Sequence, residues 1–244
     1  MKRLWLGFAL LLAVAGGVWW WFFSGTEEVP VAVRAGPTPE QRAEQAEAKR
    51  QLDLAVAAAY PEGTLVTGGA SARQFDEHRL VEAPFGPVLV SRGHVLDGAH
   101  VDAGVIAVHY LAPSEDGFRL VRSWPEAAAV GSNGDLSEWS VSDKFSDLPM
   151  LYAEGGGTGQ GYTCSYAKLV ELTARGPIEA ASIQTVYDDG GARQPGESYQ
   201  GKIGEIVKGK GFTVAFTGTR SFAEHYVRQG DRFVPQGKSR LPAC

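Results

Sequence analysis

The pair of residues best placed to do chemistry together is Ser165 with Lys168, in the stretch CSYAK. On a helix these side chains would share a face, and the lysine amine could take the proton of the serine hydroxyl, as in serine hydrolases. On a strand they would point to opposite faces, which forbids a dyad. Neither an S-D-N nor a K-[ST]-G segment accompanies the pair. A periplasmic serine hydrolase is therefore an alternative hypothesis for this chain.

A second group of candidates is His94, His100 and Asp102, in the stretch GHVLDGAHVDAG. Imidazole and carboxylate groups bind zinc and copper, and these three residues would face one way if the stretch were a single strand. The glycines favour turns instead, and neither H-E-x-x-H nor another zinc-ligand spacing is present. Histidines on a solvated loop are the simpler interpretation, and a metal-binding module is an alternative.

Residues 152–166 read YAEGGGTGQGYTCSY and contain five glycines. A dinucleotide fingerprint fails because Gln160 and Tyr162 stand where a third glycine is needed, and a P-loop fails because Tyr162 replaces the lysine. We therefore predict no nucleotide cofactor, and no other cofactor. Glycine permits positive φ and close backbone approach, so we interpret the run as a tight corner that leads into a long strand.

Aromatic residues could form a carbohydrate-binding platform if they shared a face, although such residues more often fill a β-core. The residues concerned are Trp124, Trp139, Tyr162, Tyr166 and Tyr187. A carbohydrate-binding module is therefore a further alternative.

The two cysteines are Cys164 and Cys244. Two cysteines in an exported domain most simply form one disulfide, because that compartment is oxidising. We predict the bond Cys164–Cys244, with two free thiols as the alternative.

The N-terminus carries a topology signal. Residues 4–23 hold no charge and are long enough for a helix that crosses a bilayer, and Lys2 and Arg3 precede them. The positive-inside rule then keeps residues 1–24 as a cytoplasmic stub and membrane anchor and exports the rest. Ala13-Val14-Ala15 also fits a signal-peptide cleavage site, so a cleaved signal peptide is the alternative. We expect a single-pass inner-membrane protein with a periplasmic C-terminal domain.

The remaining chain divides into three parts. Residues 25–37 are a mixed linker without a helical stripe. Residues 38–60 begin with Thr38, Pro39 and Gln41, a helix start of the capping-box type, and form a spacer helix. Residues 61–244 alternate short β-branched and aromatic runs with glycine-containing turns, which predicts a β-domain. Strands are expected around residues 88–90, 105–111, 118–124, 139–141, 162–173, 178–187, 203–207, 212–217, 222–228 and 232–234, and a short helix at 71–81.

The sequence thus predicts a mainly β fold: one N-terminal transmembrane helix, a short spacer helix, and an antiparallel β-sandwich or barrel-like domain of meandering hairpins. The formal net charge of −5 argues against nucleic acid and anionic lipid as partners, because both need positive protein surface. Sheet edges accept partner chains. We therefore expect a non-enzymatic binding or accessory role, as a subunit of an envelope membrane complex with an envelope protein as partner.

Overall fold

The structure is a computed structural model that describes residue 36, residues 38–67 and residues 71–244. The predicted anchor at 1–24 lies outside these residues, as does the predicted linker at 25–37 apart from residue 36. Among the helices in the described part of the chain, none combines the length and apolar character needed to cross a membrane. Glu44–Cys244 form one compact unit, and the few described residues before Glu44 belong to a separate first unit.

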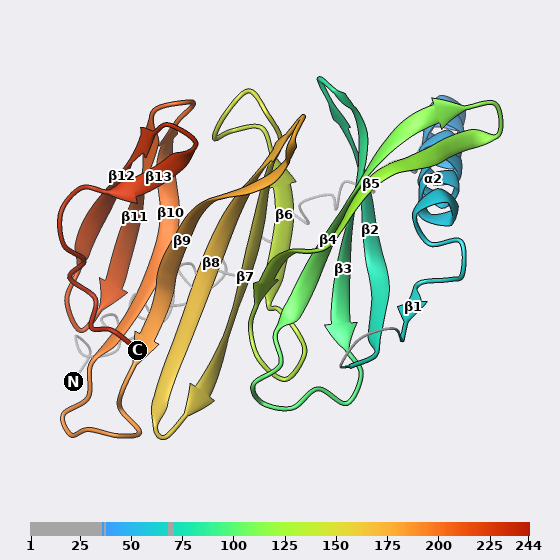
Figure 1. The fold of residues 1–244 in the computed structure, drawn as a ribbon. Helices are drawn as coiled ribbons and strands as arrows, with labels where there is room; N and C mark the ends of the chain where they lie inside the picture. The colour runs from blue at the N-terminus through green and yellow to red at the C-terminus, as the bar shows by residue number, and fades with distance from the viewer. Residues whose placement is uncertain (1–35, 37, 68–70) are drawn as a thin grey trace, which may run out of the picture. The chain divides into compact units, whose positions relative to one another are not determined.

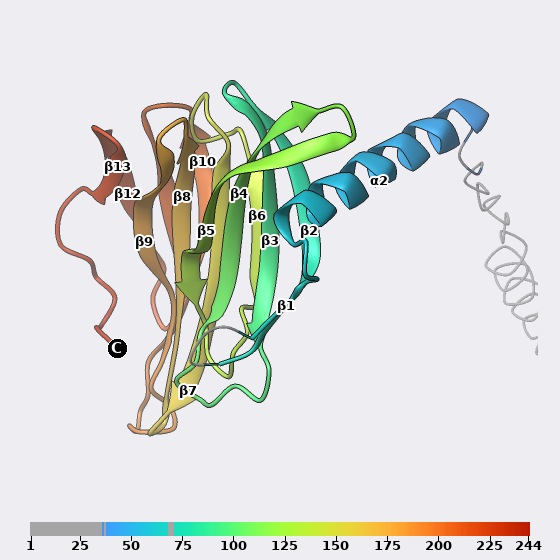
Figure 2. The same ribbon diagram turned by 45° about the vertical axis from the view of Figure 1, so that its right-hand side comes forward.

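Helix α2 (Pro39–Ala59) confirms that a helix forms within residues 38–60. The capping box forms as expected: the Thr38 backbone N–H donates to Oε1 of Gln41 at 2.9 Å, and the Gln41 N–H donates to Oγ1 of Thr38 at 3.2 Å. In the second unit, Ala55 and Ala59 are buried against the first β-sheet. The C-terminal half of the helix is therefore part of the β-domain core (Figure 2).

The domain contains two antiparallel sheets in which every strand pairs with its neighbour in sequence (Figure 1). The five-stranded sheet has the order β1 (Leu65–Val66), β2 (Arg73–Ala83), β3 (Gly86–Val95), β4 (Gly104–Ser114) and β5 (Gly117–Val130). The eight-stranded sheet curves into a half-barrel. It comprises β6 (Glu138–Ser142), β7 (Met150–Gly159), β8 (Tyr162–Thr173), β9 (Gly176–Asp188), β10 (Ser198–Val207), β11 (Gly211–Gly218), β12 (Phe222–Gln229) and β13 (Arg232–Pro235).

The main core lies between the two sheets. Side chains of β3 and β4, such as Val88 and Ile106, meet Leu151 of β7 and Val170 of β8. The opposite face of the five-stranded sheet packs on helix α2 through residues such as Leu89. Because both faces of this sheet are covered, β3 and β4 are almost continuously buried, as expected for central strands without a solvent face.

A second core lies within the eight-stranded sheet, where Met150, Leu169 and Ile183 cluster with aromatic side chains of β11–β13 such as Phe212 and Phe233. Beside it, Arg228 of β12 donates from both terminal nitrogens to Glu171 of β8, at 2.9 and 2.7 Å. Glu171 is only 3% exposed. Burial raises the pKa of Glu171. Hydrogen bonds from Arg228 and Ser146, together with the charge of Arg228, outweigh burial and leave this pKa below its ordinary value.

Each predicted strand lies within a strand of the structure, but the prediction of a helix at 71–81 is wrong. Residues 73–83 form β2, which pairs along its length with β3 around a bulge between Phe75 and Glu77. The charged residues of this segment favour a helix locally, but a strand can hold them because one side of β2 stays partly exposed. Phe75 enters the core. Pairing with a buried neighbour therefore overrides local propensity.

Candidate functional site

The structure does not bring Ser165 and Lys168 together. Both lie on β8, three positions apart, and strand alternation therefore directs their side chains to opposite faces. Lys168 instead pairs with Glu179 of β9, at 3.0 Å between Nζ and Oε2. This geometry is the strand arrangement that forbids a serine–lysine dyad.

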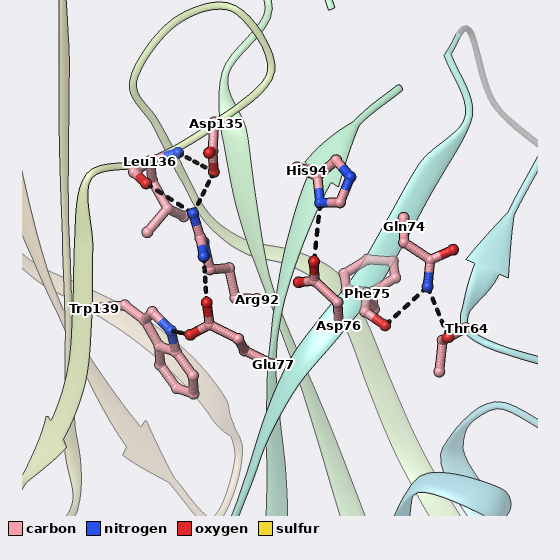
Figure 3. Close-up of polar contacts among 10 residues, drawn as sticks. All are labelled: Thr64, Gln74, Phe75, Asp76, Glu77, Arg92, His94, Asp135, Leu136 and Trp139. Atoms are coloured by element: carbon pink, nitrogen blue, oxygen red, sulfur yellow. Dashed lines mark hydrogen bonds and ion pairs between the residues drawn. The ribbon is translucent and has the colours of Figure 1, made fainter. Parts of the chain in front are cut away.

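The candidate metal ligands are also separated. His94 lies on β3 with its Nδ1 3.4 Å from Oδ2 of Asp76 (Figure 3). Asp102 lies in the following loop, where it accepts the Ala99 backbone N–H at 2.7 Å, and His100 lies beside the glycines of β7. Within the described residues, no three His, Cys, Asp or Glu side chains are grouped as metal ligands.

Next to His94, Figure 3 shows a polar cluster that links the two sheets. Arg92 of β3 contacts Glu77 of β2 and donates to Oδ1 of Asp135 at 2.7 Å, in the loop before β6. Nε1 of Trp139, on β6, donates to Glu77 at 2.8 Å. The Trp139 hydrogen bond and the Arg92 charge lower the pKa of Glu77. The charged groups of the cluster are paired with one another, although Nε of Arg92 is buried without a hydrogen-bond partner among the described residues. These contacts between strands and the β5–β6 loop give the cluster a structural role.

The glycine run forms most of strand β7, and the prediction of a corner holds only for its end. Gln160 and Gly161 have φ of 53° and 83° and make the two-residue turn between β7 and β8. Within β7, a Cβ on Gly155 would lie 2.6 Å from the Cα of Gly131, and one on Gly157 would lie 2.8 Å from Oγ of Ser132. The glycines therefore allow the end of β5 to approach β7 closely.

The aromatic residues do not form one platform. Tyr162 and Tyr166 line a shallow depression of about 510 Å³ over the glycines. Tyr187 is buried, Trp124 packs on Tyr110, and Trp139 belongs to the Arg92 cluster. A row of rings for a sugar chain is therefore not assembled.

The two cysteines meet, as predicted. The sulfur atoms of Cys164, on β8, and Cys244 are within bonding distance, and their Cα atoms are 6.3 Å apart. Gln184 of β9 donates to the carbonyl of Pro242 at 3.2 Å, and Leu241 packs against the second core. The C-terminal segment is thus held on the half-barrel by several contacts.

A groove of about 820 Å³ lies on the half-barrel, between strands β6 and β7 on one side and β10 and β11 on the other. Such a volume is in the range of ligand-binding clefts, about 300–1,000 Å³. Its lining combines carboxylates, lysines, hydroxyl groups and apolar side chains. The residues are Glu138, Ser140, Ser142, Lys144, Phe145, Tyr152, Glu154, Thr185, Val186, Gln200, Gly201, Lys202, Ile203, Ile206, Ala215 and Thr217.

One end of the groove carries two carboxylates. Glu138 of β6 and Glu154 of β7 are direct cross-strand partners, an arrangement of like charges that costs stability. Thr185 donates to Oε1 of Glu154 at 2.6 Å, and the hydroxyl of Tyr152 donates to Oε2. Burial and the nearby carboxylate raise the pKa of Tyr152. In the described part of the chain, neither glutamate forms an ion pair with a basic side chain.

A buried polar network lies between the end of helix α2 and the five-stranded sheet. Nε2 of His109 lies 2.9 Å from the hydroxyl of Tyr60, and its Nδ1 lies 2.9 Å from Oγ of Ser123. His78 contacts Ser91 at 2.9 Å. His109 is 4% exposed, and burial, with a smaller contribution from His78, lowers its pKa to about 4. The imidazole is therefore neutral near pH 7.

We expect this network to make the domain acid-sensitive. The pKa of His109 is lower in the folded than in the unfolded chain. The contribution of the neutral imidazole to the free energy of unfolding is therefore complete above about pH 6.5, and it is lost as the pH falls towards 4. This shift of the His109 pKa corresponds to a decrease of about 3 kcal/mol in the free energy of unfolding at pH 4. Urea unfolding from pH 7.5 to 4.5 measures it, and His109→Gln should show a shallower pH dependence than wild type. Equal pH dependence in the two proteins would contradict the assignment.

The residues that make the groove were not among those singled out from the sequence. Alternate positions of the short strand β6 hold Glu138, Ser140 and Ser142, which therefore share one face. Their polarity is the only local sign in the sequence that this face meets solvent. Nothing local indicates that Glu154 lies opposite Glu138, because that depends on strand register. No protein-family model, no curated protein and no solved structure matches the chain.

Proposed function

We propose that the chain is a non-enzymatic binding protein whose half-barrel groove holds part of a partner. In this proposal residues 4–23 anchor it in the inner membrane, the β-domain is periplasmic, and the protein is an accessory subunit of an envelope complex. The apolar N-terminal segment with its preceding basic residues supports the anchor.

The observation that carries the binding role is the groove itself. It is concave, has the volume of a ligand site, and contains two carboxylates without basic partners among the described residues. A like-charged cross-strand pair is unfavourable in the free protein and is relieved by a ligand of opposite charge. The alternatives have less support, because the serine–lysine pair and the histidine group are separated on the strands and loops described above.

A groove-filling variant tests this proposal. Ala215→Trp places a large ring in the groove, and Val121→Trp, at a 54% exposed position on β5, is the matched control. The full-length proteins would be extracted from their own membranes in mild detergent and analysed by native mass spectrometry. We expect a stoichiometric partner with wild type and Val121→Trp, and its loss from Ala215→Trp. A lone protomer, or a partner retained by Ala215→Trp, would refute the role of the groove.

A further inference from the structure

The wall of the groove contains a free strand edge. Strand β10 pairs with β9 only through Ser198, Tyr199 and Gln200. Beyond Gln200, strand β10 pairs with β11 on one side alone. Residues 176–185 of β9 are not paired with β10. The sheet is therefore split, and one edge of β10 lacks a neighbouring strand within the described part of the chain.

This edge faces the groove. Gly201, Lys202 and Ile203 line the groove, and a bulge between Gly204 and Val207 ends the regular part of the strand. The regular free edge therefore spans about four residues. An unpaired edge presents backbone N–H and C=O groups that an extended chain can pair with as an added strand.

The groove is chemically different at its two ends. Glu138 and Glu154 lie at one end, where β6 begins, and Phe145 and Lys144 follow the other end of β6. Strand β6 has five residues, so its two ends lie roughly 13 Å apart at about 3.3 Å per residue. The groove is thus acidic at one end and carries Lys144 at the other, and along β10 its lining combines Ile203 and Ile206 with Lys202.

We propose that the groove binds an extended peptide segment of a partner protein, as a short strand added to the free edge of β10. A basic side chain of the segment lies over Glu138 and Glu154, its apolar side chains contact the isoleucines of β10, and an acidic group lies near Lys144. This inference rests on the proposed function and specifies the binding mode and the chemistry of the partner.

The test uses a fluorescein-labelled peptide, Lys-Val-Thr-Val-Glu with blocked ends, and the full-length protein in detergent. We expect saturable binding by fluorescence anisotropy. Glu138→Gln/Glu154→Gln should weaken the binding about tenfold, because the attraction of both carboxylates for the peptide lysine is lost. The matched control, Glu115→Gln/Asp116→Asn in the β4–β5 turn, removes the same charge elsewhere and should bind as wild type does.

The backbone pairing is tested separately. A peptide N-methylated at alternate residues keeps its side chains but loses strand hydrogen bonds, and we expect its affinity to fall about 100-fold. Hydrogen exchange should show protection of residues 201–204 on binding of the unmodified peptide, which is a readout independent of the variants. Equal binding by the methylated peptide, no protection of these amides, or no binding at all would overturn the inference.

The two proposals fail in different ways. If Ala215→Trp loses the native partner while the peptide does not protect β10, the groove is the binding site but strand addition is wrong. If Ala215→Trp keeps its native partner, the proposed function is wrong, and the peptide result then decides strand addition alone.

Discussion

Replacement of Arg228 by alanine is expected to lower the free energy of unfolding by about 3–5 kcal/mol. The variant removes both hydrogen bonds to Glu171 and leaves a carboxylate that is 3% exposed without its partner. A buried charge without a partner is strongly destabilising. The intact pair itself contributes little to the free energy of unfolding, because its attraction is offset by the cost of removing both charges from water. Urea unfolding at pH 7 measures the change.

Two further variants separate this explanation from general damage. Replacing both residues, as Glu171→Met/Arg228→Met, removes the charge together with its partner and should recover much of the lost stability. Arg50→Ala breaks an arginine–glutamate pair on the exposed surface of helix α2, and we expect a far smaller change. If Arg228→Ala unfolded at the same urea concentration as wild type, the pair would have no role in stability.

Loss of the Cys164–Cys244 bond has the second largest expected effect. The cysteines are 80 residues apart in sequence, and closing a loop of that length stabilises a domain by about 4 kcal/mol at most, by restricting the unfolded chain. We expect Cys244→Ser to unfold at a lower urea concentration than wild type. We also expect faster hydrogen exchange in the C-terminal segment that contacts Gln184.

A reductant supplies the control for this prediction. Wild type should move to the stability of the variant when the reductant is added, and the double variant Cys164→Ser/Cys244→Ser should not respond. Thiol titration of the unfolded, non-reduced protein should find no free thiol. Two free thiols, or a wild type that ignores the reductant, would show that the bond does not form.

The strands could be predicted because most of them alternate apolar and polar residues between glycine-containing turns. The prediction of secondary structure failed where the local sequence pattern disagrees with the way the segment pairs or packs in the fold. Residues 71–81 are charged enough to suggest a helix, yet β3 pairs with them as a strand. The glycines of β7 suggested a corner because glycine-rich runs favour turns. Gly155 instead lies against Gly131, which is more than twenty residues away and cannot be recognised from the run itself.

The candidate site was less predictable for a physical reason. The groove exists because β10 leaves β9 after three residue pairs, and that divergence is a property of the sheet and not of any short segment. Likewise, the buried His109 lies 2.9 Å from the hydroxyl of Tyr60, which is 49 residues away in the sequence. Patterns of spacing indicated Ser165, Lys168, His94, His100 and Asp102, whose types suit catalysis or metal binding but which the fold holds apart.

The order of the strands has a consequence for how the domain forms. In both sheets each strand pairs with the one that precedes it along the chain, so most ladders require the closure of a short loop only. Folds dominated by such local contacts form faster than those that pair distant segments. A chain supplied from one end, by a ribosome or a translocation channel, can therefore assemble each sheet strand by strand in the order of arrival.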